Sequence, residues 1–356
     1  MEKKQQLRDG AVEIPASNRK VSVFNSIDLS GPNIQQICIC EIWALFQACL
    51  DCEFFYVVNH GISQEFMGQV FSESKRFFEL PLAEKMKVFR NEKHRGYTPV
   101  LDELSDPGSQ VHAGDYKEGY YIGVEVPEDD PQAEKPFYGP NVWPAADVLS
   151  GWRQTMERFH KEALEVARAV ARIIAVGLDL EADFFDRPEM LGQPIAILRL
   201  LRYGGGILIC SRAISFWTFL KGIFGAGAHS DNGLITLLAI DEVFGLQDKN
   251  AQPQVWEYVA PLKGAFIVSL GDMLERWSNC IFRSTLHRVV GNGQEGYSKA
   301  YFVEPSHDCL VECLPTCKSE KKSSQVRRNH NLLFPPIKCG TYRSQRCKDT
   351  RADLNG

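Results

Sequence analysis

A change of pattern near Pro194 limits the possible folds of this chain more than any other feature of its sequence. Upstream of it, residues 145–178 carry apolar side chains three and four positions apart, which predicts a long amphipathic helix. Downstream of it, short apolar runs are separated by Gly and Asn, which predicts strands and tight turns. Helices followed by many short strands favour a mainly β fold, a sandwich or a barrel, with a helical N-terminal region.

Several shorter elements are predicted upstream of the long helix. Residues 1–20 are polar and charged, and we expect them to form a flexible lead-in. Periodicity then predicts a strand over residues 21–29, a helix over 34–52, a strand over 54–58 and a helix over 64–78. The apolar face of the long helix comprises Trp152, Met156, Phe159, Ala163, Val166, Ala167, Val170, Ile173 and Ile174.

Residues 90–140 are rich in Gly, Pro, Asp, Tyr and His. Long loops with aromatic and charged side chains commonly carry binding specificity, so we expect this segment to line a substrate pocket. The alternative for each candidate is ordinary surface loop chemistry. The candidates are His94, Arg95, Tyr97, Tyr116 and Tyr120.

The composition is that of a globular protein. Of the 356 residues, 44% are hydrophobic and 24% charged, which excludes collagen-like, wholly disordered and small disulfide-scaffold proteins. The formal net charge of -5 gives no overall reason to expect nucleic-acid binding. Residues 315–356 nevertheless hold ten Lys or Arg against three Asp or Glu. A basic terminus can bind RNA or a membrane, but we favour a solvated surface.

The eleven cysteines are an odd number, and the chain starts without an apolar secretory segment. Both observations argue against a disulfide framework and favour a reducing, cytoplasmic location. Two groups invite comparison with zinc sites, namely Cys49 with Cys52, and Cys309, Cys313 and Cys317 at intervals of four. Neither group has a second pair at finger-like spacing, so we expect thiols without metal.

Residues 207–220 form an apolar stretch without a clear period. This stretch is shorter than the roughly 20 residues that span a bilayer, and it contains Arg212. We therefore favour an insertion between strands over a membrane anchor.

The strongest chemical signal is His229-Ser230-Asp231, with His287 following 56 positions after Asp231. Residues i and i+2 of a strand project to one face, so His229 and Asp231 can present an imidazole and a carboxylate together. A distant strand can then add His287. Two imidazoles and one carboxylate occupy one face of an octahedron and leave three positions open, as in non-haem Fe(II) oxygenases. An isolated His-x-Asp is common by chance, but the apolar strand predicted over residues 235–240 supports the site.

These ligand types suit oxidative chemistry. Thiolates would bind too strongly, and a cage of four ligands would leave no room for a chelating co-substrate and dioxygen. A single carboxylate leaves a net positive charge at the iron, which attracts an anionic 2-oxo acid. Iron held in this way can reduce dioxygen.

At these residues the sequence resembles the plant-type 2-oxoglutarate and Fe(II)-dependent dioxygenases, the superfamily that includes isopenicillin N synthase. The resemblance implies a double-stranded β-helix, a jelly roll of two sheets with the iron between them, preceded by a mostly helical region. It covers about residues 20–350 and is carried by FFYVVNHGI (54–62), KGIFGAGAHSDNGLITLLA (221–239), GLQ (245–247), WEYVAPLKGAFIVSLGDMLERWSN (256–279) and STLHRVVGNG (284–293).

The resemblance implies roles for particular residues. His229, Asp231 and His287 match the iron ligands, and Tyr203 matches a tyrosine near the co-substrate. The implied division of the chain is an N-terminal non-haem dioxygenase region over residues 21–150, supporting helices over 151–190, the jelly-roll core over 194–310 and a basic C-terminal segment over 311–356.

Gly271-Asp272 falls in a turn before the strand of the third ligand, where we expect ordinary turn chemistry. Other positions depart from the family pattern. They are the insertion over residues 204–220, a shortened run after Gln247, and Glu53 where a glycine usually precedes the paired phenylalanines.

A further departure concerns the co-substrate. About nine to eleven residues after the last His ligand, the family has an Arg-x-Ser motif that holds the far carboxylate of 2-oxoglutarate, and here this window reads Gly-Tyr-Ser (296–298). Ser298 is present, but Gly296 replaces the arginine, which should weaken co-substrate binding by about 2–4 kcal/mol. Strand alternation turns the neighbouring Lys299 and Arg288 away from this position, so we expect neither to substitute.

We therefore expect a 2-oxoglutarate-dependent Fe(II) dioxygenase of specialised metabolism, acting as a cytoplasmic monomer on a small organic molecule. Fe(II), 2-oxoglutarate and O2 would take part, with ascorbate as reductant and succinate and CO2 as co-products. Hydroxylation, desaturation, demethylation and ring closure are all open. No nucleic-acid or membrane partner is expected. Two alternatives are an iron-binding pseudoenzyme or impaired copy, whose hold on 2-oxoglutarate is lost through Gly296, and catalysis without 2-oxoglutarate.

Overall fold

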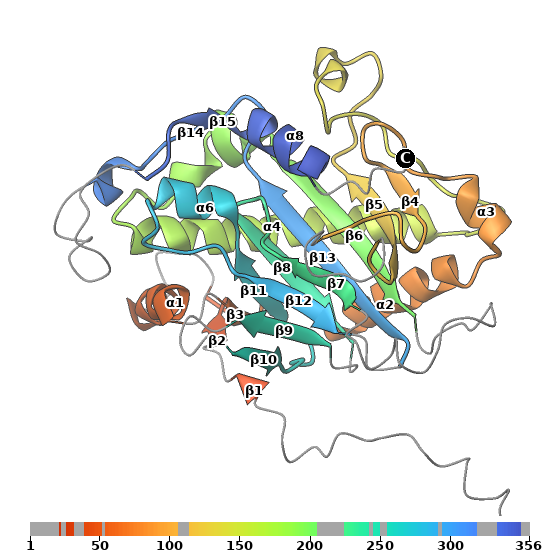
Figure 1. Ribbon diagram of the computed structural model, residues 1–356, viewed down its shortest axis with the longest axis horizontal. Coiled ribbons are helices and arrows are strands. Elements are labelled where there is room, and N and C mark those ends of the chain that lie inside the picture. Colours follow the sequence, from red (N-terminus) through yellow and green to blue (C-terminus); the bar gives the residue numbers. More distant parts are fainter. Residues whose placement is uncertain are drawn as a thin grey trace, which may run out of the picture.

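Two main β-sheets, a small two-stranded sheet of β14 (Leu310–Val311) and β15 (Ile337–Lys338), and the helices beside them make up the computed structural model (Figure 1). It describes residues 21–22, 26–31, 39–51, 54–105, 114–204, 224–241, 245–249, 255–290, 294–318 and 333–349. The expected lead-in over residues 1–20, Glu53, and all but the first residue of the expected insertion over 204–220 lie outside these ranges. No helix within these ranges is long and apolar enough to cross a membrane.

The strands in chain order are β1 (Val21–Ser22), β2 (Ser26–Asp28), β3 (Phe54–Val58), β4 (Gly96–Thr98), β5 (Lys117–Gly123), β6 (Ile195–Tyr203), β7 (Phe224–His229), β8 (Ile235–Ile240), β9 (Leu246–Lys249), β10 (Trp256–Val259), β11 (Phe266–Leu270), β12 (His287–Val290), β13 (Gly296–Glu304), β14 (Leu310–Val311) and β15 (Ile337–Lys338). The α-helices are α1 (Ile39–Asp51), α2 (Gln64–Phe78), α3 (Leu82–Met86), α4 (Trp152–Gly177), α6 (Asp272–Trp277) and α8 (Cys339–Asp349). Shorter helical turns are η3 (Pro131–Glu134), η4 (Phe184–Asp186), η5 (Pro188–Gly192) and η6 (Pro315–Cys317).

Strands that are distant in the sequence are neighbours in both main sheets. The larger sheet has the order β2-β3-β11-β8-β13-β6-β5-β4, and the smaller has the order β1-β10-β9-β12-β7. In the larger sheet β13 lies between β6 and β8, and in the smaller β12 lies between β9 and β7, all in antiparallel pairs. Two facing sheets joined by such crossing connections form a jelly roll, which confirms the predicted fold class.

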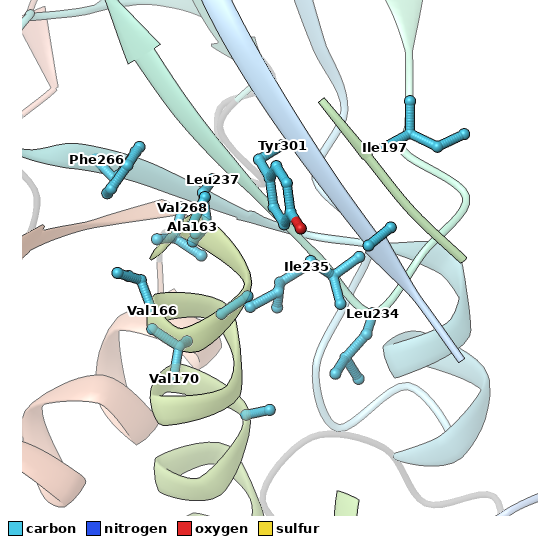
Figure 2. Close-up of a cluster of buried hydrophobic side chains, with 14 of the residues drawn as sticks. Ala163, Val166, Val170, Ile197, Leu234, Ile235, Leu237, Phe266, Val268 and Tyr301 are labelled. Carbon is cyan, nitrogen blue, oxygen red and sulfur yellow. The ribbon is translucent and has the colours of Figure 1, made fainter. Parts of the chain in front are cut away.

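The long helix α4 packs across the outer face of the larger sheet, against β13, β8, β6 and β5 (Figure 1). Figure 2 shows Ala163 of this helix beside Leu237 and Val268 of the sheet. Every residue of the apolar face predicted for the helix is buried. Each large aliphatic side chain buried in this way contributes roughly 1.5–3 kcal/mol, so this contact anchors the sheet on which the site is built.

Helix boundaries follow local capping. Helix α2 covers the predicted range, because the Ser63 hydroxyl accepts a hydrogen bond from the Phe66 backbone N–H at 3.1 Å and starts the helix. Helix α4 begins at Trp152, later than the predicted start at residue 145. The reason is Gly151, whose left-handed backbone with φ of 77° precedes the first helical residue.

Side chains of β13 alternate between two environments. Ser298 faces the smaller sheet, whereas Tyr301 faces the helices, where its hydroxyl lies 3.3 Å from Nδ1 of His160 on α4. Figure 2 shows the Tyr301 ring on this helical side. One part of the space between the two sheets is filled by an apolar cluster, which comprises Phe54, Tyr56, Leu246, Val259, Ala265 and Ile267.

Lys299 is a buried cation on the helical side of β13. The residue is 1% exposed, its ammonium lies over the ring of Phe71, and its Nζ has no hydrogen-bond partner among the described residues. Burial lowers the pKa of Lys299 well below its ordinary value, and the attraction of Asp241 only partly offsets this. The strand that lacks the family arginine therefore also contains a buried lysine whose charged form is disfavoured by its surroundings.

We expect Lys299→Met to raise the free energy of unfolding by about 1–3 kcal/mol, because methionine fills the site without burying a polar group. Denaturant unfolding at neutral pH measures the change. The unfolded chain binds the Lys299 proton more tightly than the folded chain does. The stability of the parent protein should therefore rise with pH from the lowered folded pKa up to the ordinary value of 10.5.

The variant should lack this contribution to the pH dependence. Lys161→Met, at an exposed position of α4, is the matched control and should change stability little. If Lys299→Met were no more stable than the parent, Lys299 would not be a destabilising buried charge.

Candidate metal centre and active site

The three residues predicted to bind metal come together between the two sheets. Strands β7 and β12 are antiparallel neighbours, and His229 is paired directly with His287 across them. Asp231 Oδ1 lies 3.9 Å from the Nε2 atom of each imidazole. One possible ligand atom from each residue lies within 4.8 Å of the others, which is close enough for a single metal ion to contact all three.

Backbone carbonyls set the direction of both imidazole rings. Nδ1 of His229 lies 2.7 Å from the Gly227 carbonyl oxygen, and Nδ1 of His287 lies 3.0 Å from the Thr285 carbonyl oxygen. A carbonyl oxygen only accepts hydrogen bonds, so each Nδ1 donates its proton and each Nε2 presents a lone pair. Hydrogen bonds of this kind orient metal-binding histidines.

Asp231 is oriented in a different way from the one predicted. Strand β7 ends at His229, so strand alternation does not direct Asp231. Instead, the hydroxyls of Thr236 and Ser269 donate to Oδ2 at 2.6 and 3.1 Å, which leaves Oδ1 toward the imidazoles. The backbone carbonyl of Asp231 accepts a hydrogen bond from the N–H of Asp272 at 2.8 Å.

Gly271 and Asp272 hold the ligand loop in place, which corrects the expectation of ordinary turn chemistry. A side chain at Gly271 would collide with the backbone of Gly233, next to the loop residues that follow Asp231. Asp272 begins α6, and its carboxylate accepts a hydrogen bond from the Tyr342 hydroxyl at 2.6 Å. Glycine is therefore required where the start of α6 approaches the ligand loop.

His229 and Asp231 have the protonation states that bind a divalent metal. Burial lowers the pKa of His229 to about 4, with a further contribution from His287, and the attraction of Asp231 only partly offsets this. Burial alone would raise the pKa of Asp231, but the two imidazoles and the hydroxyls of Thr236 and Ser269 outweigh it and lower the pKa. A neutral imidazole and a carboxylate are the forms that coordinate metal. Two nitrogen donors and one oxygen donor fit Fe(II).

The two residues predicted near the co-substrate also meet. Tyr203, the last residue of β6, is paired in register with Gly296 of β13. The Ser298 hydroxyl donates to the Tyr203 hydroxyl at 3.3 Å. Burial raises the pKa of Tyr203 to about 12, so the phenol stays neutral and can donate a hydrogen bond. We call Tyr203, Gly296 and Ser298 the co-substrate patch.

A cavity of about 360 Å³ opens beside His229 and Asp231. Its walls come from residues 90–105, from β5, β6 and β13, and from α8. A cavity of this size suits a small organic molecule. The lining residues with ionisable or hydroxyl side chains include Arg90, His94, Asp102, Glu103, Ser105, Tyr121, Arg199, Glu304, Arg343 and Arg346.

One of the five loop residues predicted to line a pocket does so, namely His94. Arg95, Tyr97 and Tyr120 are wrong predictions, because they are at most 1% exposed and belong to the interior of the protein. Tyr116 is not part of the wall of this cavity. Residues 90–140 therefore contribute to the cavity wall mainly through side chains that were not among the predicted candidates.

Tyr121, Glu103 and Arg199 line the cavity but were not predicted from the sequence. Glu103 forms an ion pair with Arg199 and accepts a hydrogen bond from the Tyr121 hydroxyl. Burial would raise the pKa of Glu103, but the attraction of Arg199 and other cations lowers it to about 2. Alternation along β5 separates Tyr120 from Tyr121, yet no signal in the sequence tells which face meets the cavity.

Helix α8 closes one side of the cavity, near the upper end of β13 in Figure 1. Arg346 Nε donates to Asn232 Oδ1 at 3.0 Å, and its Nη2 donates to Ser230 Oγ at 3.3 Å. Both acceptors flank the candidate carboxylate ligand. Arg343 pairs with Glu304 of β13. For Arg343 and Arg346, these contacts correct the interpretation of the basic C-terminal segment as a solvated surface, whereas Lys318 and Lys338 are exposed as expected.

The cysteine groups considered for zinc do not form a metal site in the described part of the chain. There, the group with metal-site geometry is the His-Asp-His cluster. Cys309 and Cys313 are free thiols, and burial raises the pKa of Cys309 to about 12. Cys52 lies outside the described residues.

Comparisons with known proteins agree with this geometry. The family described as non-haem dioxygenase in morphine synthesis N-terminal matches residues 25–146, and the 2OG-Fe(II) oxygenase superfamily matches residues 217–305. Kihadalactone A synthase LFS of Citrus sinensis is 47% identical over 345 residues, covering 96% of this chain and 95% of that protein. Azadirone synthase LFS of Melia azedarach is 44% identical over 352 residues, covering 97% and 99%.

A solved structure shows the same fold. A full-length protein of Neurospora crassa, crystallised in complex with alpha-KG, has a TM-score of 0.74 to this chain at 31% identity, covering 92% of this chain and 96% of that one. The chain therefore belongs to the 2OG-Fe(II) oxygenase superfamily and is a 2-oxoglutarate/Fe(II)-dependent dioxygenase. Enzymes of this family use Fe(II), 2-oxoglutarate and O2, which confirms the resemblance and the cofactors inferred from the sequence.

We expect Arg346→Ala to loosen α8 while leaving the central sheet intact, because the variant loses the hydrogen bonds to Ser230 and Asn232. Hydrogen exchange should show roughly 1–2 kcal/mol less protection in residues 339–349, with unchanged protection in β8 and β13. Gln345→Ala, at an exposed position of the same helix, is the control. Equal exchange in the two variants would mean that Arg346 does not hold α8 against the ligand loop.

Proposed function

We propose that His229, Asp231 and His287 hold the Fe(II) of this dioxygenase. We further propose that the enzyme couples oxidation of a small organic molecule to decarboxylation of 2-oxoglutarate, giving succinate and CO2. The observation that carries the proposal is that both Nε2 atoms lie 3.9 Å from the same oxygen of Asp231 while both Nδ1 atoms are held by backbone carbonyls. Two imidazoles and one carboxylate leave room for a chelating 2-oxo acid and O2.

The bound iron would pass to dioxygen the electrons that 2-oxoglutarate and the substrate give up. The residues of the chain orient the ligands and shield them from water. Thr236 and Ser269 engage Oδ2 of Asp231, so that Oδ1 is directed to the metal. Asp231 is 5% exposed and His287 is 9% exposed, and this burial limits competing water. Ascorbate is the proposed reductant.

Tyr203 and Ser298 are the proposed contacts of the far carboxylate of 2-oxoglutarate. Their hydroxyls lie 3.3 Å apart on the inner face of the larger sheet. Each hydroxyl can donate one hydrogen bond to a carboxylate oxygen. Together they would fix the orientation of the co-substrate.

The proposed substrate is a small organic molecule that occupies the cavity beside His229. Two relatives that match nearly the whole chain are named as synthases of kihadalactone A and of azadirone. This similarity supports a substrate of related chemistry. The wall includes the cations Arg199 and Arg343 as well as the anion Glu103, so polar groups of either kind can find a partner there. Hydroxylation, desaturation, demethylation and ring closure remain open, since the fold does not choose among them.

An iron-binding pseudoenzyme or impaired copy is a second candidate, and Gly296 is the observation that favours it. Glycine offers no side chain where the family has a bidentate cation, and charge-assisted pairs are the strongest hydrogen bonds in such sites. In this case the iron cluster would be intact, but 2-oxoglutarate would bind too weakly for turnover.

We also propose that the enzyme acts as a monomer in the cytoplasm, without nucleic-acid or membrane partners. The proposed division of the chain into regions follows the ranges expected from the sequence. Residues 21–150 and 151–190 would form the N-terminal region and its supporting helices, residues 194–310 the catalytic core, and residues 311–356 the C-terminal segment.

We expect His229→Ala to abolish stoichiometric Fe(II) binding, because two ligands from a facial set cannot hold the ion against water. Metal content after anaerobic loading and desalting measures this. His307→Ala removes an imidazole that pairs with Asp308 outside the cluster, and it should retain the metal. Full Fe(II) occupancy in His229→Ala would show that the ligand assignment is wrong.

The coupled reaction predicts succinate release from the Fe(II)-loaded protein supplied with 2-oxoglutarate, ascorbate and O2. Slow release without a primary substrate is the expected result, and His229→Ala should give none. Absence of succinate from parent protein that demonstrably holds iron and is supplied with saturating 2-oxoglutarate and candidate substrates would favour the pseudoenzyme.

A further inference from the structure

The inner face of the larger sheet brings a lysine next to the position that lacks the family arginine. In the register of β5, β6 and β13, Lys117 is paired with Tyr203, and Tyr203 is paired with Gly296. Paired residues of neighbouring strands project to the same face. Lys117 therefore shares the face of the co-substrate patch, two strand spacings or roughly 10 Å from Gly296.

Contacts with the smaller sheet place the Lys117 ammonium between the sheets. The Lys117 side chain is 4% exposed and forms an ion pair with Asp115. Asp115 in turn accepts a hydrogen bond from the Gly227 N–H of β7 at 3.2 Å. The Tyr203 ring also lies against β7, where a side chain at Gly225 would collide with it. Lys117 and Tyr203 thus approach the same strand, which ends in the first metal ligand.

The electrostatics agree with this placement. Burial is the largest cause of the lowered pKa of Lys117 and the charge of Arg199 adds to it, while the attraction of Glu103 and Asp115 only partly offsets the lowering. An incoming carboxylate would raise it further and favour the charged form.

Other cations nearby are directed elsewhere. Lys299 lies on the helical side of the sheet, and Arg288 stacks on a tryptophan of β10 with 4.1 Å between its guanidinium carbon and the ring centroid. Arg199 shares the inner face, and its guanidinium pairs with Glu103 in the cavity wall, a carboxylate that also lies 3.7 Å from the Lys117 ammonium. Among the described residues, Lys117 is the cation paired in register with the tyrosine of the co-substrate patch.

We propose that Lys117 binds the far carboxylate of 2-oxoglutarate together with Tyr203 and Ser298, in place of the arginine that Gly296 replaces. This inference rests on the proposed use of 2-oxoglutarate at the site. Lys117 is a positioning residue, since it holds the end of the co-substrate remote from the iron. Gly296 itself adds no side chain to the patch.

The local charges allow Lys117 to take this role. An ammonium carries three N–H donors and offers a compact point charge, whereas a guanidinium would bind the carboxylate through two parallel hydrogen bonds. Lys117 should therefore restore part of the affinity lost with the arginine. Asp115 keeps other donors when the ammonium engages the co-substrate, namely the Gly227 N–H and the Ser105 hydroxyl.

The test measures 2-oxoglutarate binding to the full-length, Fe(II)-loaded protein in the absence of O2, by isothermal titration calorimetry. Lys117→Met should raise the Kd for 2-oxoglutarate by roughly tenfold or more without changing the Fe(II) stoichiometry. Adding Gly296→Arg to Lys117→Met should recover most of the lost affinity, because it returns a cation to the patch.

Lys85→Met is the matched control. Lys85 is also a buried lysine in an ion pair, with 2.7 Å between its Nζ and Oε2 of Glu118, but Glu118 alternates with Lys117 and faces the other side of the sheet. Its removal should leave the Kd unchanged. A Kd for Lys117→Met within twofold of the parent value, or an equal loss in Lys85→Met, would overturn the assignment.

Two further measurements keep the test decisive. If circular dichroism shows that Lys117→Met does not fold, Lys117→Gln repeats the test while keeping a hydrogen bond to Asp115. In the parent protein, 2-oxopentanoate has the same carbon chain without the far carboxylate and should bind at least roughly tenfold more weakly than 2-oxoglutarate. Equal binding of the two acids would mean that no cation holds the far carboxylate.

The outcomes separate this inference from the proposed function. If the iron-loaded parent protein binds no 2-oxoglutarate, the proposed function fails. If the parent binds 2-oxoglutarate and the Lys117 variants bind it equally well, the proposed function stands and the role of Lys117 is wrong.

Discussion

The backbone carbonyls of Gly227 and Thr285 hold the Nδ1 protons of two histidines and turn both Nε2 atoms toward one oxygen of Asp231. The rest of the site depends on this arrangement. Strands β7 and β12 must be neighbours for the imidazoles to meet, and α6 must begin against the loop that carries Asp231. Metal sites function within deviations of about half an ångström, so they require a rigid support, and two packed sheets provide one.

The two faces of the larger sheet have different roles. Its outer face packs on α4 and supplies stability, while its inner face presents Tyr203 and Ser298 to the space beside the metal cluster. Strand β13 carries one unusual residue on each face. Gly296 lies on the inner face, where it concerns the affinity for 2-oxoglutarate. Lys299 lies on the outer face, where it concerns the free energy of unfolding. Because the two faces are separated by the sheet, these effects should be independent.

Much of this could be predicted from local pattern. The range of α2 and the buried face of α4 follow from periodicity and capping, which act over a few residues, and the members of the metal cluster follow from residue type and the resemblance to one superfamily. The residues of the cavity wall could not be predicted from local pattern. Tyr121 was missed in favour of Tyr120 because alternation defines two faces of β5 without telling which one the rest of the chain covers. Arg346 was missed because its partners Ser230 and Asn232 lie 116 and 114 residues away in the sequence.

The sequence by itself determined the fold class, the family and the identity of the three candidate ligands, since ligand chemistry is set by residue type and their spacing is typical of one superfamily. Only the tertiary structure decided how Asp231 is oriented, which side chains line the cavity, and that Lys117 shares a face with Tyr203. These features depend on strand register and on contacts between distant segments. Register is fixed by the whole sheet at once, so no short stretch of sequence specifies it.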